Sequence, residues 1–174
     1  MSGTLYGAVL LQSGTLLAAL LLGFAALKDI AVRIIPDIVP FGVLAVGLIL
    51  RSSGGDLVPA AIASAATFLV AGLCWRYGWL GGGDVKLLAA SVWLVRPPLV
   101  PELVLTIAVA GGLLALLYLS LHWLTRGRSA WVPVRPRSVV RRVWQVERWR
   151  IRRGGSLPYG CAIAVGALLT MTDG

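Results

Sequence analysis

The sequence predicts an all-α polytopic membrane protein that forms one membrane-embedded domain over residues 1–174. Two observations carry this prediction. Hydrophobic residues make up 58% of the chain and charged residues only 13%, against about 45–50% and about 25% in soluble domains. A helix crosses the bilayer with about 20 apolar residues, so a chain of 174 residues has room for six crossings and no soluble domain of useful size.

Six apolar runs follow one another along the chain and are the expected transmembrane helices. Three of them are short for a full crossing at about 1.5 Å rise per residue, so they either extend through their polar flanks or end below the lipid headgroups. The first run has no basic segment before it and is expected to be retained. The runs are Thr4–Leu27, Ile38–Leu50, Leu57–Trp75, Val85–Val95, Leu103–Leu124 and Leu157–Met171.

Basic residues are divided unequally between the two sides of this six-helix topology. One side carries 14 of the 16 Lys and Arg residues, and the other carries only Arg51 and Arg96. Because Lys and Arg concentrate in cytoplasmic loops, the side with 14 is expected to be cytoplasmic. Both termini are therefore expected to be non-cytoplasmic.

The polar segment 125–156 is expected to be a basic cytoplasmic loop between the fifth and sixth helices. Within it, Ser138–Arg153 has Val139, Val140, Val143, Trp144 and Ile151 near one face at helical spacing. This pattern predicts a basic interfacial helix, with the Arg126–Arg153 segment binding anionic membrane lipids. Nucleic acid is not an expected partner, because no glycine-rich or aromatic readout module is present. A solvated loop with no further role is the alternative.

Three aspartates stand out because each lies at a cytoplasmic end of an apolar run: Asp29, Asp37 and Asp84. Ionisable groups near hydrocarbon are costly and are often functional, although the cost falls at the interface. The other acidic residues have simpler explanations as turn, loop or terminal residues: Asp56, Glu102, Glu147 and Asp173.

Each of the three aspartates also has a structural explanation. Asp84 follows the glycines 81–83 and could be the N-cap of the next helix. Three glycines exceed what a cap needs, however, and allow a neighbouring helix or an extended peptide to approach closely. Asp29 could be a charge neutralised by Lys28 or Arg33, and Asp37 could cap the second helix. Position alone does not choose between them.

Two neighbouring carboxylates have a specific chemical capability. They do not both ionise easily, so one retains a proton while the other accepts a proton from water. This arrangement hydrolyses peptides without a metal ion or cofactor, and neither is expected here. A serine–histidine or cysteine–histidine arrangement is absent from the sequence, because His122 is the only histidine and is expected to be an interfacial anchor.

Three segments resemble the motifs of the type IV prepilin peptidases, also called leader peptidases. Residues 29–37 read DIAVRIIPD and resemble the family's D-x-x-x-x-x-I-P-[ND] pattern, in which an arginine is also expected near position 33. Residues 81–90 read GGGDVKLLAA and resemble its GxGD segment. Residues 157–164 read LPYGCAIA and resemble the P-Y-G-x-A-I motif that opens the last helix.

The resemblance implies a GxGD intramembrane aspartyl protease of the cytoplasmic (inner) membrane. Such an enzyme removes the short basic leader from prepilin-like substrates of type IV pilus or protein secretion systems. The resemblance is to the small branch that lacks the N-terminal CxxC/methyltransferase region, so methylation of the product is not expected. It implies that Asp29 and Asp84 are catalytic and that Asp37 is structural. Residues that would shape the site or meet substrate are Gly81, Gly83, Lys86, Arg33 and Pro36.

Two other functions remain open at this point. The first is a non-catalytic membrane scaffold or transporter subunit of a secretion or pilus system, which would use the aspartates as helix caps or a proton relay. The second is a presenilin-like protease, which also uses GxGD. Proteases of that kind have more spans and a Pro-Ala-Leu motif that this sequence lacks.

Overall fold

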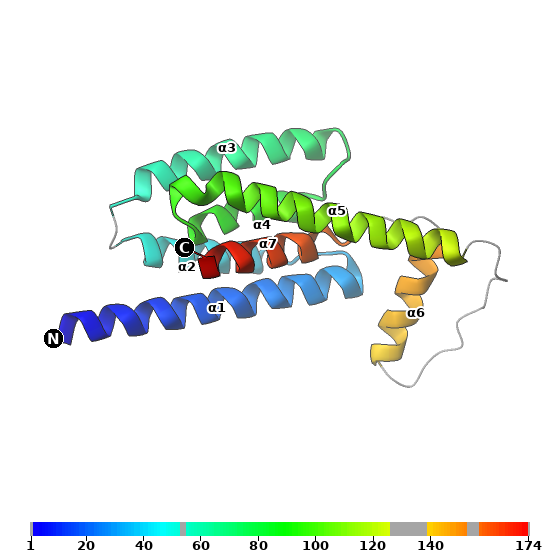
Figure 1. Ribbon diagram of the computed structural model, residues 1–174, viewed down its shortest axis with the longest axis horizontal. Coiled ribbons are helices and arrows are strands. Elements are labelled where there is room, and N and C mark those ends of the chain that lie inside the picture. Colours follow the sequence, from blue (N-terminus) through cyan, green and yellow to red (C-terminus); the bar gives the residue numbers. More distant parts are fainter. Residues whose placement is uncertain (1, 53–54, 126–138, 153–156, 174) are drawn as a thin grey trace.

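The computed structural model describes residues 2–52, 55–125, 139–152 and 157–173, and all regular structure in these residues is helical (Figure 1). The predicted all-α class is therefore confirmed. The elements, in chain order, are α1 (Ser2–Val32), α2 (Ile38–Ser52), α3 (Leu57–Arg76), α4 (Gly82–Ser91), the 3-10 turns η1 (Val92–Leu94) and η2 (Pro97–Leu99), α5 (Val100–Thr125), α6 (Val139–Arg152) and α7 (Tyr159–Asp173).

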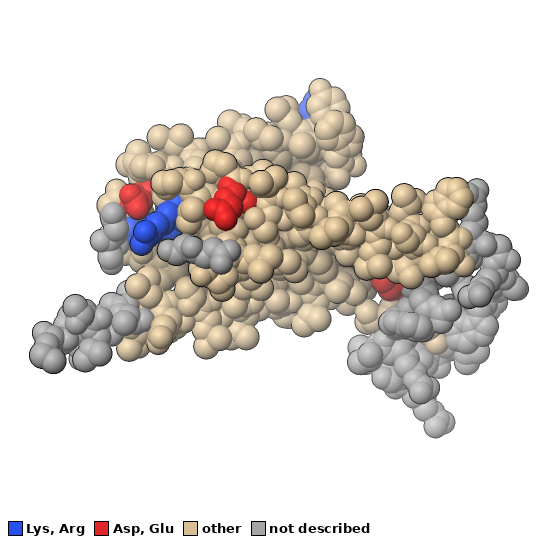
Figure 2. Space-filling model, in the orientation of Figure 1, with Lys and Arg blue, Asp and Glu red and all other residues tan. Residues whose placement is uncertain are grey.

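Three helical stretches in the described residues are long and apolar enough to cross a membrane: Leu11–Val32, Leu57–Arg76 and Pro97–Leu124. Two shorter apolar helices, Ile38–Ser52 and Tyr159–Thr172, lie among them. The face in Figure 2 carries few charged side chains along these helices, as expected for a surface that meets lipid. The chain is thus a membrane protein, and the count of six spans stays a prediction.

The core lies where α7 packs between α1 and α5 (Figure 1). Side chains that are fully buried come from five different helices: Leu22, Val43, Leu87, Leu103 and Ile163. Lipid is as apolar as these side chains, so close packing rather than exclusion of water holds such helices together. Because α7 occupies the centre, its first turn lies beside the end of α1.

Glycines allow the closest helix contacts in this core. A Cβ atom added to Gly166 of α7 would overlap Ile107 of α5, including its backbone. A Cβ atom on Gly47 of α2 would likewise overlap Trp93 in η1. Small residues at such crossings let two backbones approach, which strengthens packing where no hydrophobic effect operates.

The first helix ends later than the apolar run Thr4–Leu27 predicts. It continues through Val32, and the backbone then turns at Arg33, whose φ is +60°. Asp29 consequently lies in the last turn of α1 and not beyond its end. The fourth apolar run differs as well, because its helix begins at Gly82 and changes to a 3-10 turn at Val92.

The predicted basic helix Ser138–Arg153 is present as α6, Val139–Arg152. It lies across one end of the bundle, and the first turn of α1 and the last turn of α7 lie toward the other end (Figure 1). The remainder of the predicted loop, residues 126–138 and 153–156, lies outside the described residues.

Candidate active site

Asp29 is held by the first turn of α7. Its side chain is buried, with 5% of the residue exposed, and the Gly160 amide donates a hydrogen bond to its Oδ2 over 2.7 Å. Gly160 is the second residue of α7, where backbone N–H groups have no partner within the helix. The positive end of the α7 dipole also favours a carboxylate at this position. The tail motif therefore contributes a backbone donor to Asp29.

Asp84 is the third residue of α4, so it is not the N-cap that the sequence allowed. Gly81 occupies the cap position, and its amide donates to Oδ2 of Asp84 over 3.2 Å. The other carboxylate oxygen, Oδ1, is buried and has no hydrogen-bond partner among the described residues. A buried acceptor without a partner is costly and is often a functional group.

The Asp29 carboxylate acts electrostatically on Asp84. Burial raises the pKa of Asp84 from 3.8 to about 6, and the second cause of the rise is the Asp29 carboxylate. The Gly81 amide and the Arg33 guanidinium act in the opposite direction. A carboxyl group whose pKa is raised by burial and by a second carboxylate is the arrangement expected of an acid–base pair.

Ile35 packs between the segments that carry the two aspartates. A Cβ atom on Gly83 would lie 3.1 Å from Ile35 Cβ, and one on Gly160 would lie 3.0 Å from Ile35 Cδ1 and 2.9 Å from Asp29 Oδ2. A side chain at either position would crowd Ile35 or Asp29, so both positions need glycine for close contact with the connection between α1 and α2. Pro36 follows Ile35 directly and restricts it to an extended backbone.

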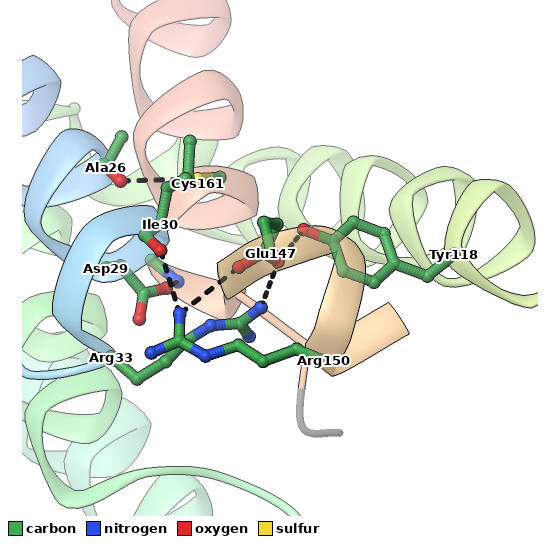
Figure 3. Close-up of polar contacts among 9 residues, drawn as sticks. Ala26, Asp29, Ile30, Arg33, Tyr118, Glu147, Arg150 and Cys161 are labelled. Carbon is green, nitrogen blue, oxygen red and sulfur yellow. Dashed lines mark hydrogen bonds and ion pairs between the residues drawn. The ribbon is translucent and has the colours of Figure 1, made fainter. Parts of the chain in front are cut away.

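Arg33 and α6 form a polar cluster beside Asp29 (Figure 3). The Arg33 guanidinium donates to Oε1 of Glu147, and so does the hydroxyl of Tyr118. Arg150 donates to Oε2 of Glu147 over 3.2 Å and to the Ile30 carbonyl over 3.0 Å. The cluster joins α1, α5 and α6 at one end of the bundle.

Lys86 and Asp37 form an ion pair of 2.7 Å away from this cluster, and both side chains are largely exposed. The resemblance implies that Lys86 shapes the site or meets substrate, and in the structure its ammonium contacts Asp37. Lys86 also lines an apolar groove of about 610 Å³ between α2, α3 and α4. Neither Asp29 nor Asp84 lines that groove.

The described residues contain no group of three His, Cys, Asp or Glu side chains that could hold a metal ion.

Five of the predicted site residues belong to the two aspartate-bearing segments and the contacts around them: Asp29, Arg33, Gly81, Gly83 and Asp84.

Three contributors were not singled out from the sequence: Gly160, Ile35 and Glu147. A signal for Glu147 exists, because it lies four residues from both Val143 and Ile151 and so falls within the apolar stripe of α6. A carboxylate in an apolar stripe needs partners from neighbouring helices. The signal for Gly160 was its place in the tail motif.

Comparison with known proteins supplies one match. The type IV leader peptidase family matches residues 16–116, a range that covers more than half of the chain and includes Asp29 and Asp84. Glu147 and Gly160 lie outside that range. No curated protein and no solved structure matches the chain.

Proposed function

The chain belongs to the type IV leader peptidase family, and from this we propose that it is a membrane aspartic endopeptidase. It removes the short leader from prepilin-like precursors at the cytoplasmic face of the inner membrane. The observation that carries the proposal is the pair of aspartates from separate helices, Asp29 buried and Asp84 partly buried, each with one backbone amide as donor.

In the proposed mechanism the active form is the one in which Asp84 carries a proton, and its pKa of about 6 makes this form accessible near neutral pH. Ionised Asp29 accepts a proton from a water molecule as the water oxygen attacks the scissile carbonyl carbon. Protonated Asp84 donates a hydrogen bond to the carbonyl oxygen, where negative charge develops. Collapse of the tetrahedral intermediate breaks the C–N bond, and a carboxyl proton passes to the leaving amine.

The topology supports cleavage near the membrane surface. We place six spans in the inner membrane, with non-cytoplasmic termini, so that the ends of α1 and the starts of α4 and α7 face the cytoplasm. Helix α6 lies across the end of the bundle where α1 ends (Figure 1). In this topology α6 lies along the cytoplasmic leaflet, where its arginines bind anionic lipids.

The experiment is co-expression of the chain with a candidate prepilin, with leader removal read from the mobility of the pilin. We expect cleavage by wild type and none by Asp29→Asn or Asp84→Asn, because each variant lacks one half of the acid–base pair. Both variants are expected to remain in the membrane at wild-type abundance. Cleavage by either variant would disprove the two-aspartate mechanism.

The non-catalytic scaffold or transporter subunit is the competing function. In that case no pilin from a panel would be cleaved by wild type, and the two aspartates would serve the packing of helix ends. The unpartnered Oδ1 of Asp84 favours the enzyme, because a purely structural carboxylate would have its hydrogen bonds satisfied.

A further inference from the structure

Glu147 is an acidic residue in a helix that is otherwise rich in arginine. It is buried, with 9% of its surface exposed, although α6 lies at the end of the bundle. Removing a carboxylate from water is unfavourable unless charged or polar donors replace the water. Its position is therefore explained by the groups that it contacts.

Donors from three helices converge on this carboxylate (Figure 3). Arg33 at the end of α1 and Tyr118 of α5 both donate to Oε1, and Arg150 of α6 donates to Oε2. The Arg33 guanidinium also lies over the Tyr118 ring, 6.0 Å from its centroid. A second contact, 2.8 Å between His122 Nδ1 and the Ile151 carbonyl, joins α5 to the end of α6.

Arg33 connects this cluster to the aspartates. Its amide donates to the Asp29 carbonyl over 3.0 Å, and its guanidinium acts electrostatically on both Asp29 and Asp84. In the described part of the chain it is the one non-glycine residue with positive φ. That conformation costs about 1 kcal/mol or more for an ordinary residue and persists because the surrounding structure holds it.

We propose that Glu147 is a positioning residue for peptide cleavage: its carboxylate holds the Arg33 guanidinium beside Asp29 and Asp84, so that the docking of α6 completes the active site. The inference rests on the proposed function. Without Glu147 the guanidinium has other rotamers available, and its charge no longer has a fixed place relative to the two carboxylates. Because rates depend on how accurately charged groups are placed, turnover should fall more than substrate binding.

A cycle of four proteins tests the proposal: wild type, Glu147→Gln, Arg33→Gln and the double variant. Purified proteins are assayed with one prepilin to obtain kcat and KM. We expect Glu147→Gln to lower kcat about tenfold and to change KM less than about threefold. In the Arg33→Gln background the same substitution should lower kcat less than about twofold, because the residue it positions is already absent. Glu102→Gln, an exposed carboxylate on α5, is the matched control and should behave as wild type.

A role limited to fastening α6 gives a different result, namely the same loss of kcat in both backgrounds, and that result would overturn the proposal. An unchanged kcat in Glu147→Gln would also overturn the proposed role of Glu147. In either case, cleavage by wild type leaves the proposed peptidase function standing. Absence of cleavage by wild type, with every pilin of the panel, overturns both. If Glu147→Gln does not fold, Tyr118→Phe replaces it in the cycle, because it removes one donor to the same oxygen. Tyr118→Phe is expected to lower kcat less than Glu147→Gln does. In the Arg33→Gln background, Tyr118→Phe should leave kcat unchanged.

Discussion

Replacing Asp84 by asparagine is expected to stabilise the folded protein at neutral and alkaline pH while it abolishes cleavage. The carboxyl group is partly buried, and its buried Oδ1 has no hydrogen-bond partner among the described residues. Ionisation of Asp84 in the fold is therefore unfavourable compared with ionisation in the unfolded chain. Asparagine has nearly the same shape and carries no charge at any pH.

The size of the effect follows from the pKa of Asp84, which rises from 3.8 in the unfolded chain to about 6 in the fold. Each pKa unit corresponds to about 1.36 kcal/mol, so ionised Asp84 destabilises the fold by ~3 kcal/mol. Below pH 3.8 both states hold the proton and the cost is absent. It grows as pH rises from 3.8 to about 6 and is complete above that.

Thermal unfolding in detergent measures this effect, with the fluorescence of the seven tryptophans as the signal. The midpoint of Asp84→Asn should match that of wild type near pH 4 and exceed it by roughly 6–12 °C at pH 7.5. Asp37→Asn is the matched control, because Asp37 is exposed and paired with Lys86. It should give no gain that grows with pH.

If the difference in midpoint between Asp84→Asn and wild type is the same at pH 4 and pH 7.5, the reasoning is refuted. Such a result would mean that ionisation of the Asp84 carboxyl group does not destabilise the fold. Lower stability of Asp84→Asn at pH 7.5 would refute it as well, and would identify Asp84 as a satisfied helix-capping residue. Both outcomes are independent of any assay of cleavage.

Two further predictions concern cleavage. Gly160→Ala should lower the rate at least about tenfold, because the new methyl group would lie 2.9 Å from Asp29 Oδ2. Gly72→Ala, with open space around it, is its control, and equal rates for the two variants would contradict the packing argument. Asp37→Asn should keep more than about a third of the wild-type rate, since an exposed ion pair contributes little. Complete loss would mean that Asp37 takes part in the chemistry. Both are measured as leader removal from one prepilin.

Much of the fold could be predicted because helix positions depend on local composition. The apolar runs Leu57–Trp75 and Ile38–Leu50 match α3 and α2 within a few residues, since a long apolar segment in a membrane must satisfy its backbone within the helix. The basic helix α6 was predicted for a similar reason, from the spacing of its apolar side chains. Helix ends were less predictable, as the continuation of α1 past Leu27 to Val32 shows.

The sequence by itself determined that the chain is helical and apolar, and its motifs singled out Asp29 and Asp84 among seven acidic residues. What surrounds these two carboxylates was decided by the tertiary structure. Gly160, 131 positions after Asp29, supplies an amide to it, and Glu147 meets Arg33 only because α6 crosses the ends of α1 and α5. Contacts between segments so far apart depend on how helices pack, and helical periodicity specifies only which face of each helix is available.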